Sequence, residues 1–173
     1  MSHVEYAAAM LREKFGDRIP AVEEFRGQTT MVIDRGAIRA ACQLLHDDPR
    51  LRFDLLAALT AVDYWPEEPR FSIVYQLYSL QHNAFLGLRV PLFSASPEVA
   101  SIESVYPNAN WHEREVFDMF GVTFGGHSDP RRILMPADWV GHPLRKDYPL
   151  GYEEVQFTFN AAEIDRRKAY AKE

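Results

Sequence analysis

Hydrophobic residues recur at helical spacing in two segments near the start of the chain. The first segment begins at Ser2, which has capping-box spacing with Glu5, and it ends before Gly16. The second follows Asp34, a residue type that caps helices, and it stops near Pro49. The pattern predicts helices from about 2 to 15 and from about 34 to 48.

Alternating and β-branched residues predict two hairpins. Residues 21–25 and 29–33 flank a short turn, and residues 71–78 and 85–90 flank a polar turn at 81–83. Residues 55–59 are compatible with either a short helix or a strand. The stretch 71–108 has only three charged residues, so we expect it to hold the core of the sheet.

Two more helices are predicted before residue 125. Pro97 stands at a typical first helical position and predicts a helix from 96 to about 106. Gly121 is a typical residue after a helix end and predicts that a helix over 111–120 stops there.

The chain changes character after residue 125. Five Gly- or Pro-containing pairs follow one another up to Pro149, which leaves no room for a regular element of ordinary length. The segment is nevertheless rich in apolar residues, which a disordered loop would not be. We therefore expect an extended arm that lies on another surface. Beyond it, alternating apolar residues at 155, 157 and 159 predict a strand.

The predicted helix over 111–120 carries an unusual set of charges. Glu113 falls within its apolar arc, where an ionised carboxylate needs a partner or a raised pKa. Arg114 and Asp118 are four residues apart on the opposite arc with Glu115, and we expect the first two to pair. Arginines of the arm are expected to meet the helix carboxylates in a buried ion-pair network that fixes the arm. These are Arg131, Arg132 and Arg145.

Catalytic or metal chemistry is the competing interpretation. His112, His127, Asp129 and His142 could approach one another, but Val116 occupies the place of the second histidine of a metalloprotease helix. Glu113 and Glu115 lie on different arcs, which argues against a shared acid–base site. Cys42 is expected to be a packed core thiol, and the acidic group of Asp63, Glu67 and Glu68 is expected to be a solvated loop.

Composition excludes several classes of protein. The 173 residues have a formal net charge of −6, which argues against a nucleic-acid surface. A single cysteine cannot hold an iron–sulfur cluster, which takes about four. The N-terminus has no signal-peptide pattern, and no apolar run approaches the ~20 residues of a membrane span. We expect an intracellular, soluble or peripheral protein.

Two long motifs resemble one known family. The run from Glu113 to Phe124, EREVFDMFGVTF, resembles the signature of the thirty-kilodalton subunit of respiratory complex I, which is the C subunit of NADH:quinone oxidoreductase. The run from Arg131 to Pro136 and the run from Asp138 to Leu150 are similar to the same family, as are residues 61–64 and 75–80. The segment 126–130 departs from the usual family pattern and leaves the local turn there undetermined.

The resemblance implies an α+β fold: a single two-layer domain with helices on a mixed β-sheet, at residues 1–124, and a partner-binding arm and tail at residues 125–173. It implies a non-catalytic, peripheral component on the cytoplasmic side of the bacterial inner membrane, next to the D and B subunits and also the I subunit. Flavin (FMN) and Fe-S clusters would lie in those partner subunits and none in this chain. The expected interface network comprises Glu113, Arg114, Glu115, Asp118, Arg131, Arg132, Asp138, Trp139, His142, Arg145, Lys146, Asp147 and Tyr148.

Two alternatives stay open at the level of sequence. The motifs do not separate complex I from a ferredoxin-driven photosynthetic complex or a membrane-bound hydrogenase, because the electron donor would bind elsewhere. A more distant alternative is a free-standing soluble enzyme that uses His112, Glu113 and His142.

Overall fold

Three helices and seven strands make up the part of the chain that the computed structural model describes, which is residues 2–149 with Ala162 and Arg166. The helices are α1 (His3–Phe15), α2 (Ile38–Asp47) and α3 (Ala109–Phe120), with a 3-10 turn η1 (Gly16–Arg18) after α1. The strands are β1 (Ala21–Phe25), β2 (Gln28–Val32), β3 (Leu55–Asp63), β4 (Phe71–Ser79), β5 (Ala84–Leu92), β6 (Glu98–Ala100) and β7 (Thr123–Gly125).

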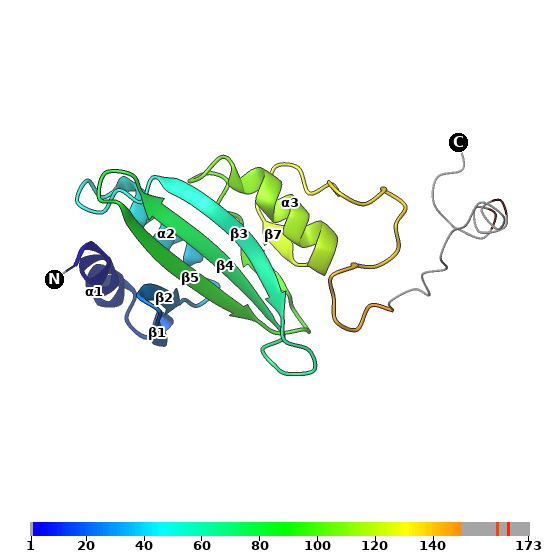
Figure 1. Ribbon diagram of the computed structural model, residues 1–173, viewed down its shortest axis with the longest axis horizontal. Helices are drawn as coiled ribbons and strands as arrows, with labels where there is room; N and C mark the ends of the chain where they lie inside the picture. Colours follow the sequence, from blue (N-terminus) through cyan, green and yellow to red (C-terminus); the bar gives the residue numbers. More distant parts are fainter. Residues whose placement is uncertain (1, 150–161, 163–165, 167–173) are drawn as a thin grey trace.

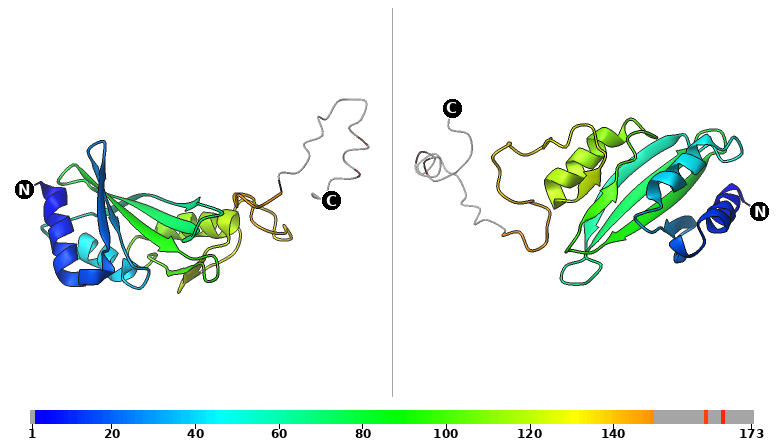
Figure 2. Two further views of the ribbon diagram at one scale, coloured as in Figure 1. Left: turned by 90° about the horizontal axis from the view of Figure 1, so that it is seen from below. Right: turned by 180° about the vertical axis from the view of Figure 1, so that it is seen from behind.

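A five-stranded mixed sheet forms one layer of the molecule. Its order is β1-β2-β5-β4-β3, and every neighbouring pair is antiparallel except β2 with β5. Helices α2 and α3 cover one face of this sheet, while no helix stands in front of β3, β4 and β5 on the other face (Figure 1; Figure 2, right). The predicted α+β fold with a mixed sheet is confirmed.

The core lies between the covered face of the sheet and the helices. Along β4 the inward positions Phe71, Ile73, Tyr75 and Leu77 are essentially inaccessible to solvent. Cys42 lies on the buried face of α2 and is also inaccessible, which confirms the expected core thiol. Burial raises the pKa of this thiol, so it stays protonated and unreactive.

Residues 55–59, which the pattern left open, belong to a strand that continues to Asp63. Buried and more exposed residues alternate along most of β3, as expected for an edge strand with one covered face. A register shift between Leu56 and Ala58 interrupts the alternation once. This irregularity is why the period of two was hard to recognise in the sequence.

The helix predicted from 96 to about 106 is absent, so that prediction is wrong. The segment instead contains β6, which pairs in parallel with β7, a strand that the sequence pattern did not predict. The backbone of Pro97 accepts from Thr123 N–H at 2.9 Å, and Ser101 N–H donates to Gly125 at 3.0 Å. These long-range backbone bonds override the local preference that Pro97 gives for a helix start.

Helix α2 starts later than predicted. Asp34 does not cap it, because its Oδ1 accepts from the backbone N–H of Gly36 at 2.9 Å and forms a local turn. The helix begins at Ile38 instead, with no side-chain cap. By contrast, the capping box of Ser2 and Glu5 on α1 is present as predicted.

Residues 126–149 contain no helix or strand, and they run from β7 along α3 and back toward the end of the sheet (Figure 1). The strand predicted around residues 155–159 lies outside the described residues. The division of the chain at residue 124 stays a prediction.

Gly121 ends α3 in the left-handed conformation, with φ of 72°, and the arm packs closely against it. A Cβ at this position would lie 2.5 Å from the side chains of His142 and Arg145. Gly27, in the hairpin turn, has a similar φ of 77° but open space around it.

Replacing Gly121 by Ala should therefore destabilise the protein more than replacing Gly27 by Ala. Both variants lose the left-handed preference, a penalty of about 1–2 kcal/mol, and only Gly121→Ala also pushes the arm away. Urea unfolding of the two variants measures the difference. Equal losses in the two variants would mean that the arm does not pack on Gly121.

Candidate functional site

Asp118, on α3, accepts four hydrogen bonds from the arm. It is fully buried, and its Oδ2 accepts from three successive backbone amides of the arm, at Ile133, Leu134 and Met135 (3.0, 2.8 and 2.8 Å). Its Oδ1 accepts from Arg132 Nη1 at 2.6 Å. Burial alone would raise the pKa of Asp118, but these donors hold its pKa below the usual range. Asp118, Arg132 and the amides of 133–135 are called the Asp118 cluster below.

Arg132 connects this cluster to a later part of the arm. Its Nη2 donates to the carbonyls of Trp139 and Gly141 at 3.0 and 2.9 Å. One guanidinium therefore hydrogen-bonds both to Asp118 on α3 and to the carbonyl of Gly141, nine residues farther along the arm. The planar, multiply donating head of arginine suits this role, which a lysine could not reproduce.

The arm also provides donors for the C-terminal end of α3. His142 Nδ1 donates to the Asp118 carbonyl at 3.0 Å, the backbone N–H of Leu144 donates to Met119 at 3.0 Å, and Arg145 Nε donates to Phe120. The last carbonyls of a helix have no partner within the helix. The arm thus satisfies polar groups of α3 that would otherwise need water.

Arg114 stabilises the beginning of the arm. Its Nε and Nη2 donate to the carbonyls of Arg131 and Arg132 at 2.9 and 3.1 Å, and its Nη1 lies 3.6 Å from Asp129 Oδ2. The guanidinium also stacks over the exposed ring of Trp111, 5.3 Å from its centroid. The predicted pair of Arg114 with Asp118 is wrong, because the arm occupies the space between them and gives each a different partner.

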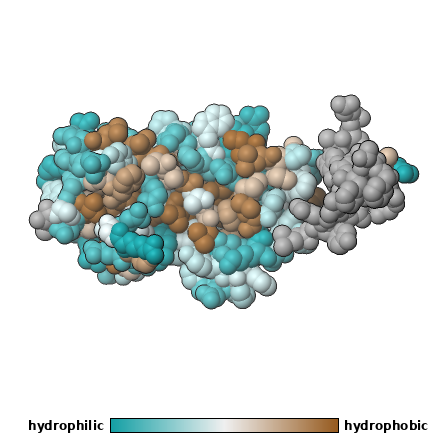
Figure 3. Space-filling view, viewed as in Figure 1, coloured by the Kyte–Doolittle hydropathy of each residue, from teal (hydrophilic) through white to brown (hydrophobic). Residues whose placement is uncertain are grey.

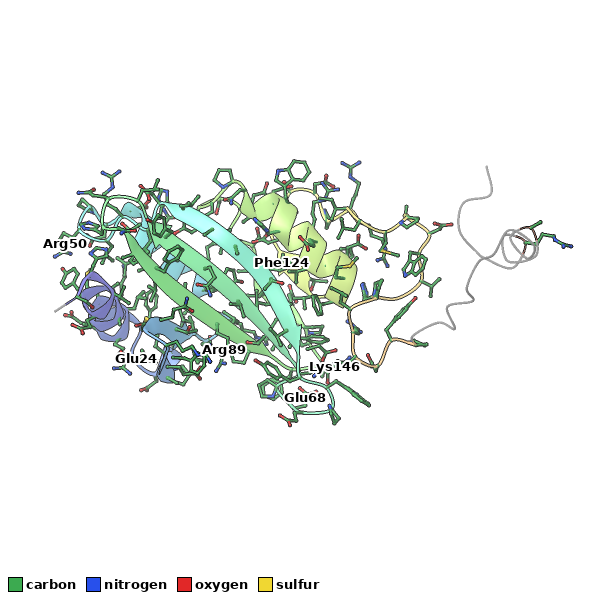
Figure 4. All side chains as sticks on the ribbon, viewed as in Figure 1. Glu24, Arg50, Glu68, Arg89, Phe124 and Lys146 are labelled. Carbon is green, nitrogen blue, oxygen red and sulfur yellow. The ribbon has the colours of Figure 1, made fainter. Side chains whose placement is uncertain are left out.

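A second anchor, which sequence reasoning missed, ties the arm to the end of the sheet. Arg70 forms a two-bond pair with Asp63, at 3.0 and 2.9 Å, and bonds Asp147 with the same guanidinium. The backbone N–H of Lys146 donates to Asp63 Oδ2 at 2.9 Å. Asp63 is buried, so the expectation of a solvated loop is wrong for it. Figure 4 shows Lys146 close to the Glu68 loop at this end of the strands.

The position of Arg70 in the sequence could have indicated its pairing with Asp63. Arg70 is the last charged residue before the apolar strand β4, seven positions after Asp63, which ends β3. Two opposite charges at the facing ends of paired antiparallel strands are close in space.

Glu113 is fully buried but receives no arginine. Its Oε1 accepts from the backbone N–H of Ile102 at 2.8 Å, and its Oε2 has no hydrogen-bond partner. His127 Nε2 lies 3.9 Å from Oε2, but the imidazole hydrogen-bonds elsewhere: its Nδ1 accepts from Asp129 N–H and its Nε2 donates to the Asn110 carbonyl. Burial raises the pKa of Glu113, and the hydrogen bonds oppose this only in part. Of the two expected alternatives, the surroundings of Glu113 favour a raised pKa over an arginine partner.

The remaining residues of the expected network are distributed as follows. Glu115 and Asp138 are exposed, and Arg131 pairs with Asp129 at the surface. Tyr148 donates to the Val140 carbonyl at 3.1 Å, and Trp139 is half-buried. That these residues contact other chains stays a prediction.

The histidines do not form a common site. His127 lies beside Glu113, whereas His142 lies at the other end of α3. Within residues 2–149, no three His, Cys, Asp or Glu side chains lie close enough to hold a metal ion. No helix in this part of the chain is long and apolar enough to cross a membrane.

Fold and site together define a small α+β protein in which the segment 126–149 is held on α3 by buried polar contacts. The chain belongs to the 30 kDa subunit family of the respiratory-chain NADH dehydrogenase, whose model matches residues 31–154. This is the family of the C subunit of NADH-quinone oxidoreductase, a component of respiratory complex I.

Relatives support this membership over most of the chain. The C subunit of the NADH-quinone oxidoreductase of Roseiflexus sp. (strain RS-1) is 48% identical over 163 residues, 94% of both chains. That of Geobacter sulfurreducens is 44% identical over 87% of this chain and 92% of its own.

Solved structures show the same fold. A trypsin-resistant fragment of Nqo5 is 27% identical, with a TM-score of 0.63, over 73% of this chain and 98% of the fragment. A chain of the membrane-bound sulfane sulfur reductase, an archaeal respiratory membrane complex, has a TM-score of 0.64 over 98% of this chain and 95% of its own. At 20% identity the latter shows the fold alone.

Replacing Asp118 by Asn should strongly destabilise the chain. The amide cannot accept from Arg132 and three amides together, and it leaves a partly buried guanidinium unpaired, a loss of about 3–5 kcal/mol. The free energy of unfolding in urea measures the effect. Asp129→Asn, which removes a half-buried carboxylate that also pairs with arginine, is the matched control and should have a much smaller effect. Comparable losses for the two variants would contradict the importance of the Asp118 cluster.

Replacing Glu113 by Gln should change how stability depends on pH. Because the folded-state pKa is raised, the stabilising contribution of the protonated carboxyl is complete below its unfolded pKa of about 4.3 and is lost as the pH rises through the folded pKa. Unfolding free energies measured from about pH 4 to 9 should fall more steeply for the wild type than for Glu113→Gln. Parallel curves would show that folding does not raise the pKa of Glu113.

Proposed function

We propose that this chain is a non-catalytic, peripheral subunit of a proton-translocating NADH:quinone oxidoreductase and that its arm holds neighbouring subunits together. Family membership supports the complex, and the geometry of the arm supports the structural role. In this proposal the complex moves electrons from NADH to quinone, and the chain supplies no reacting group of its own.

The single observation that carries the structural role is the combination of a fixed backbone with exposed apolar side chains in the arm. Buried bonds to Asp118, Arg114 and the end of α3 hold the backbone in place. The side chains of Leu134 and Val140 are nevertheless 61% and 84% exposed, and Leu144 is exposed as well. An ordered apolar surface without regular secondary structure is typical of a segment that a partner covers.

The proposed partners are the D subunit, which forms the quinone site, together with the B and I subunits. FMN and the Fe–S clusters would lie in partner subunits. The chain would lie on the cytoplasmic side of the bacterial inner membrane as a peripheral component. The resemblance of the motifs to the thirty-kilodalton family supports these assignments.

The equivalent subunit of a ferredoxin-driven photosynthetic complex or of a membrane-bound hydrogenase is the second candidate, because the motifs do not separate these complexes. A chain of the sulfane sulfur reductase complex shares the fold. In that case the arm would have the same role and the electron donor or acceptor would differ.

Recovery of the complex through a tagged chain tests the proposal. The tag is placed at the N-terminus, away from the arm, and the complex is purified from detergent-solubilised membranes. Val140→Asp should reduce the co-purifying subunits at least about tenfold, because a charge would enter a desolvated contact. Phe25→Asp is the matched control, since Phe25 is 70% exposed at the β1–β2 hairpin and outside the arm.

Isolated Val140→Asp should unfold at the same urea concentration as the wild type, because the side chain makes little contact within the chain. Normal recovery of subunits with Val140→Asp would contradict the role of the arm. Recovery of the wild-type chain alone, under conditions in which large membrane complexes survive, would contradict the whole proposal.

A further inference from the structure

The face of the sheet opposite the helices has an unusual composition. Cross-strand pairing aligns the outward residues of β3, β4 and β5 in four rows. These rows, called the outer sheet face below, are Leu55–Tyr78–Phe85, Ala58–Gln76–Gly87, Thr60–Val74–Arg89 and Val62–Ser72–Pro91. Arg89 is the one charged residue among these twelve.

An antiparallel sheet that faces water on one side normally alternates apolar and polar residues, with charges on the wet side. Here the outward positions other than Arg89 carry apolar or uncharged polar side chains, and two of them, Ser72 and Gly87, are already buried within the chain. Phe85 is 55% exposed and stacks with Tyr78 at 4.4 Å between ring centroids. Hydrophobic residues are visible on this face in the space-filling view (Figure 3).

The charge of Arg89 is already balanced within the chain. Its guanidinium pairs with Glu23 on β1. A partner therefore needs no acidic group to meet it, and the outer sheet face as a whole is neutral. Gly87 adds no side chain to this face beside β2, and there is no room for one, because a Cβ there would lie 2.6 Å from Thr30 Oγ1.

The size of the face limits what can cover it. Three strands of nine residues extend over on the order of 400 Å². A stable interface buries roughly 800 Å² on each partner, so this face provides about half of that area. A second surface must contribute the rest.

The arm adjoins the face and can provide that second surface. Val62 on the outer sheet face is followed by Asp63, whose carboxylate bonds Lys146 N–H and the Arg70 that holds Asp147. Exposed Tyr64 and Trp65 come directly after Asp63. A continuous surface therefore leads from β3 through this loop to the end of the arm.

We infer that the outer sheet face is a second contact surface, continuous with the arm, and that it is covered by a flat, uncharged apolar surface of another subunit of the same complex. The inference rests on the proposed function, since it takes the chain to be part of a complex. It adds that the partner contacts the sheet itself and not only the arm.

Photo-cross-linking in the intact complex tests this inference. A photoreactive phenylalanine analogue replaces Val62 on the face, Leu134 on the arm, or Gln43 on the exposed side of α2, and cross-linked peptides are identified by mass spectrometry. We expect Val62 and Leu134 to cross-link to another subunit, with the Val62 product in an uncharged apolar segment, and Gln43 to give no product.

The outcomes separate this inference from the proposed function. Cross-links from Leu134 without any from Val62 would overturn the outer-face contact and leave the arm's role in place. Cross-links from neither position would overturn both. A product joining Val62 to a second copy of this chain would also overturn the inference, because the outer sheet face would then be covered by the same protein and not by another subunit.

A charge substitution gives a second, independent measurement. Thr60 is exposed on the edge strand, so Thr60→Lys should leave the urea midpoint of the isolated chain unchanged. It should lower incorporation into the complex at least about tenfold. Gln43→Lys places the same charge on the opposite side of the sheet and should incorporate normally, and normal incorporation of Thr60→Lys would contradict the inference.

Discussion

The binding of the arm depends on one carboxylate that is completely removed from water. Asp118 loses its hydration in the folded chain and receives four donors in return, three backbone amides and one guanidinium. A buried charge is tolerated only when its hydrogen bonds are satisfied, so the carboxylate and the arm require each other. The described part of the arm has no helix or strand to fix its backbone, and the contacts to α3 take the place of regular structure.

The pKa values of the two buried carboxyl groups of α3 are shifted in opposite directions. Asp118 is surrounded by donors, which lower its pKa, whereas Glu113 has one backbone donor and one oxygen without a partner, so burial raises its pKa. Their environments differ because the two side chains face different neighbours. Asp118 faces the arm, whereas Glu113 faces the interior beside β6 and β7. Helix α3 is therefore enclosed on two sides, which explains why a short helix carries so many charges of structural importance.

The sequence predicted the elements that local chemistry determines. The capping box at Ser2, the hairpin around Gly27 and the end of α3 at Gly121 each follow from the residues present at those positions. The helix after Pro97 was wrong because β7, 26 residues away, pairs with that segment. The partners within the site could not be deduced from the helix pattern either. The arc of Asp118 was expected to meet arginines of the arm, but only the path of the arm decides that Asp118 pairs with Arg132 and not with Arg114.

The central claim is that the arm is already folded on α3 before any partner binds. Hydrogen exchange of the isolated chain tests it directly, because the amides of residues 133–135 all donate to Asp118 Oδ2. The account predicts that these three amides exchange slowly, and that they become fast together when Asp118 is replaced by Asn. Exchange of these amides at the rate of an unstructured peptide in the wild-type chain would contradict it.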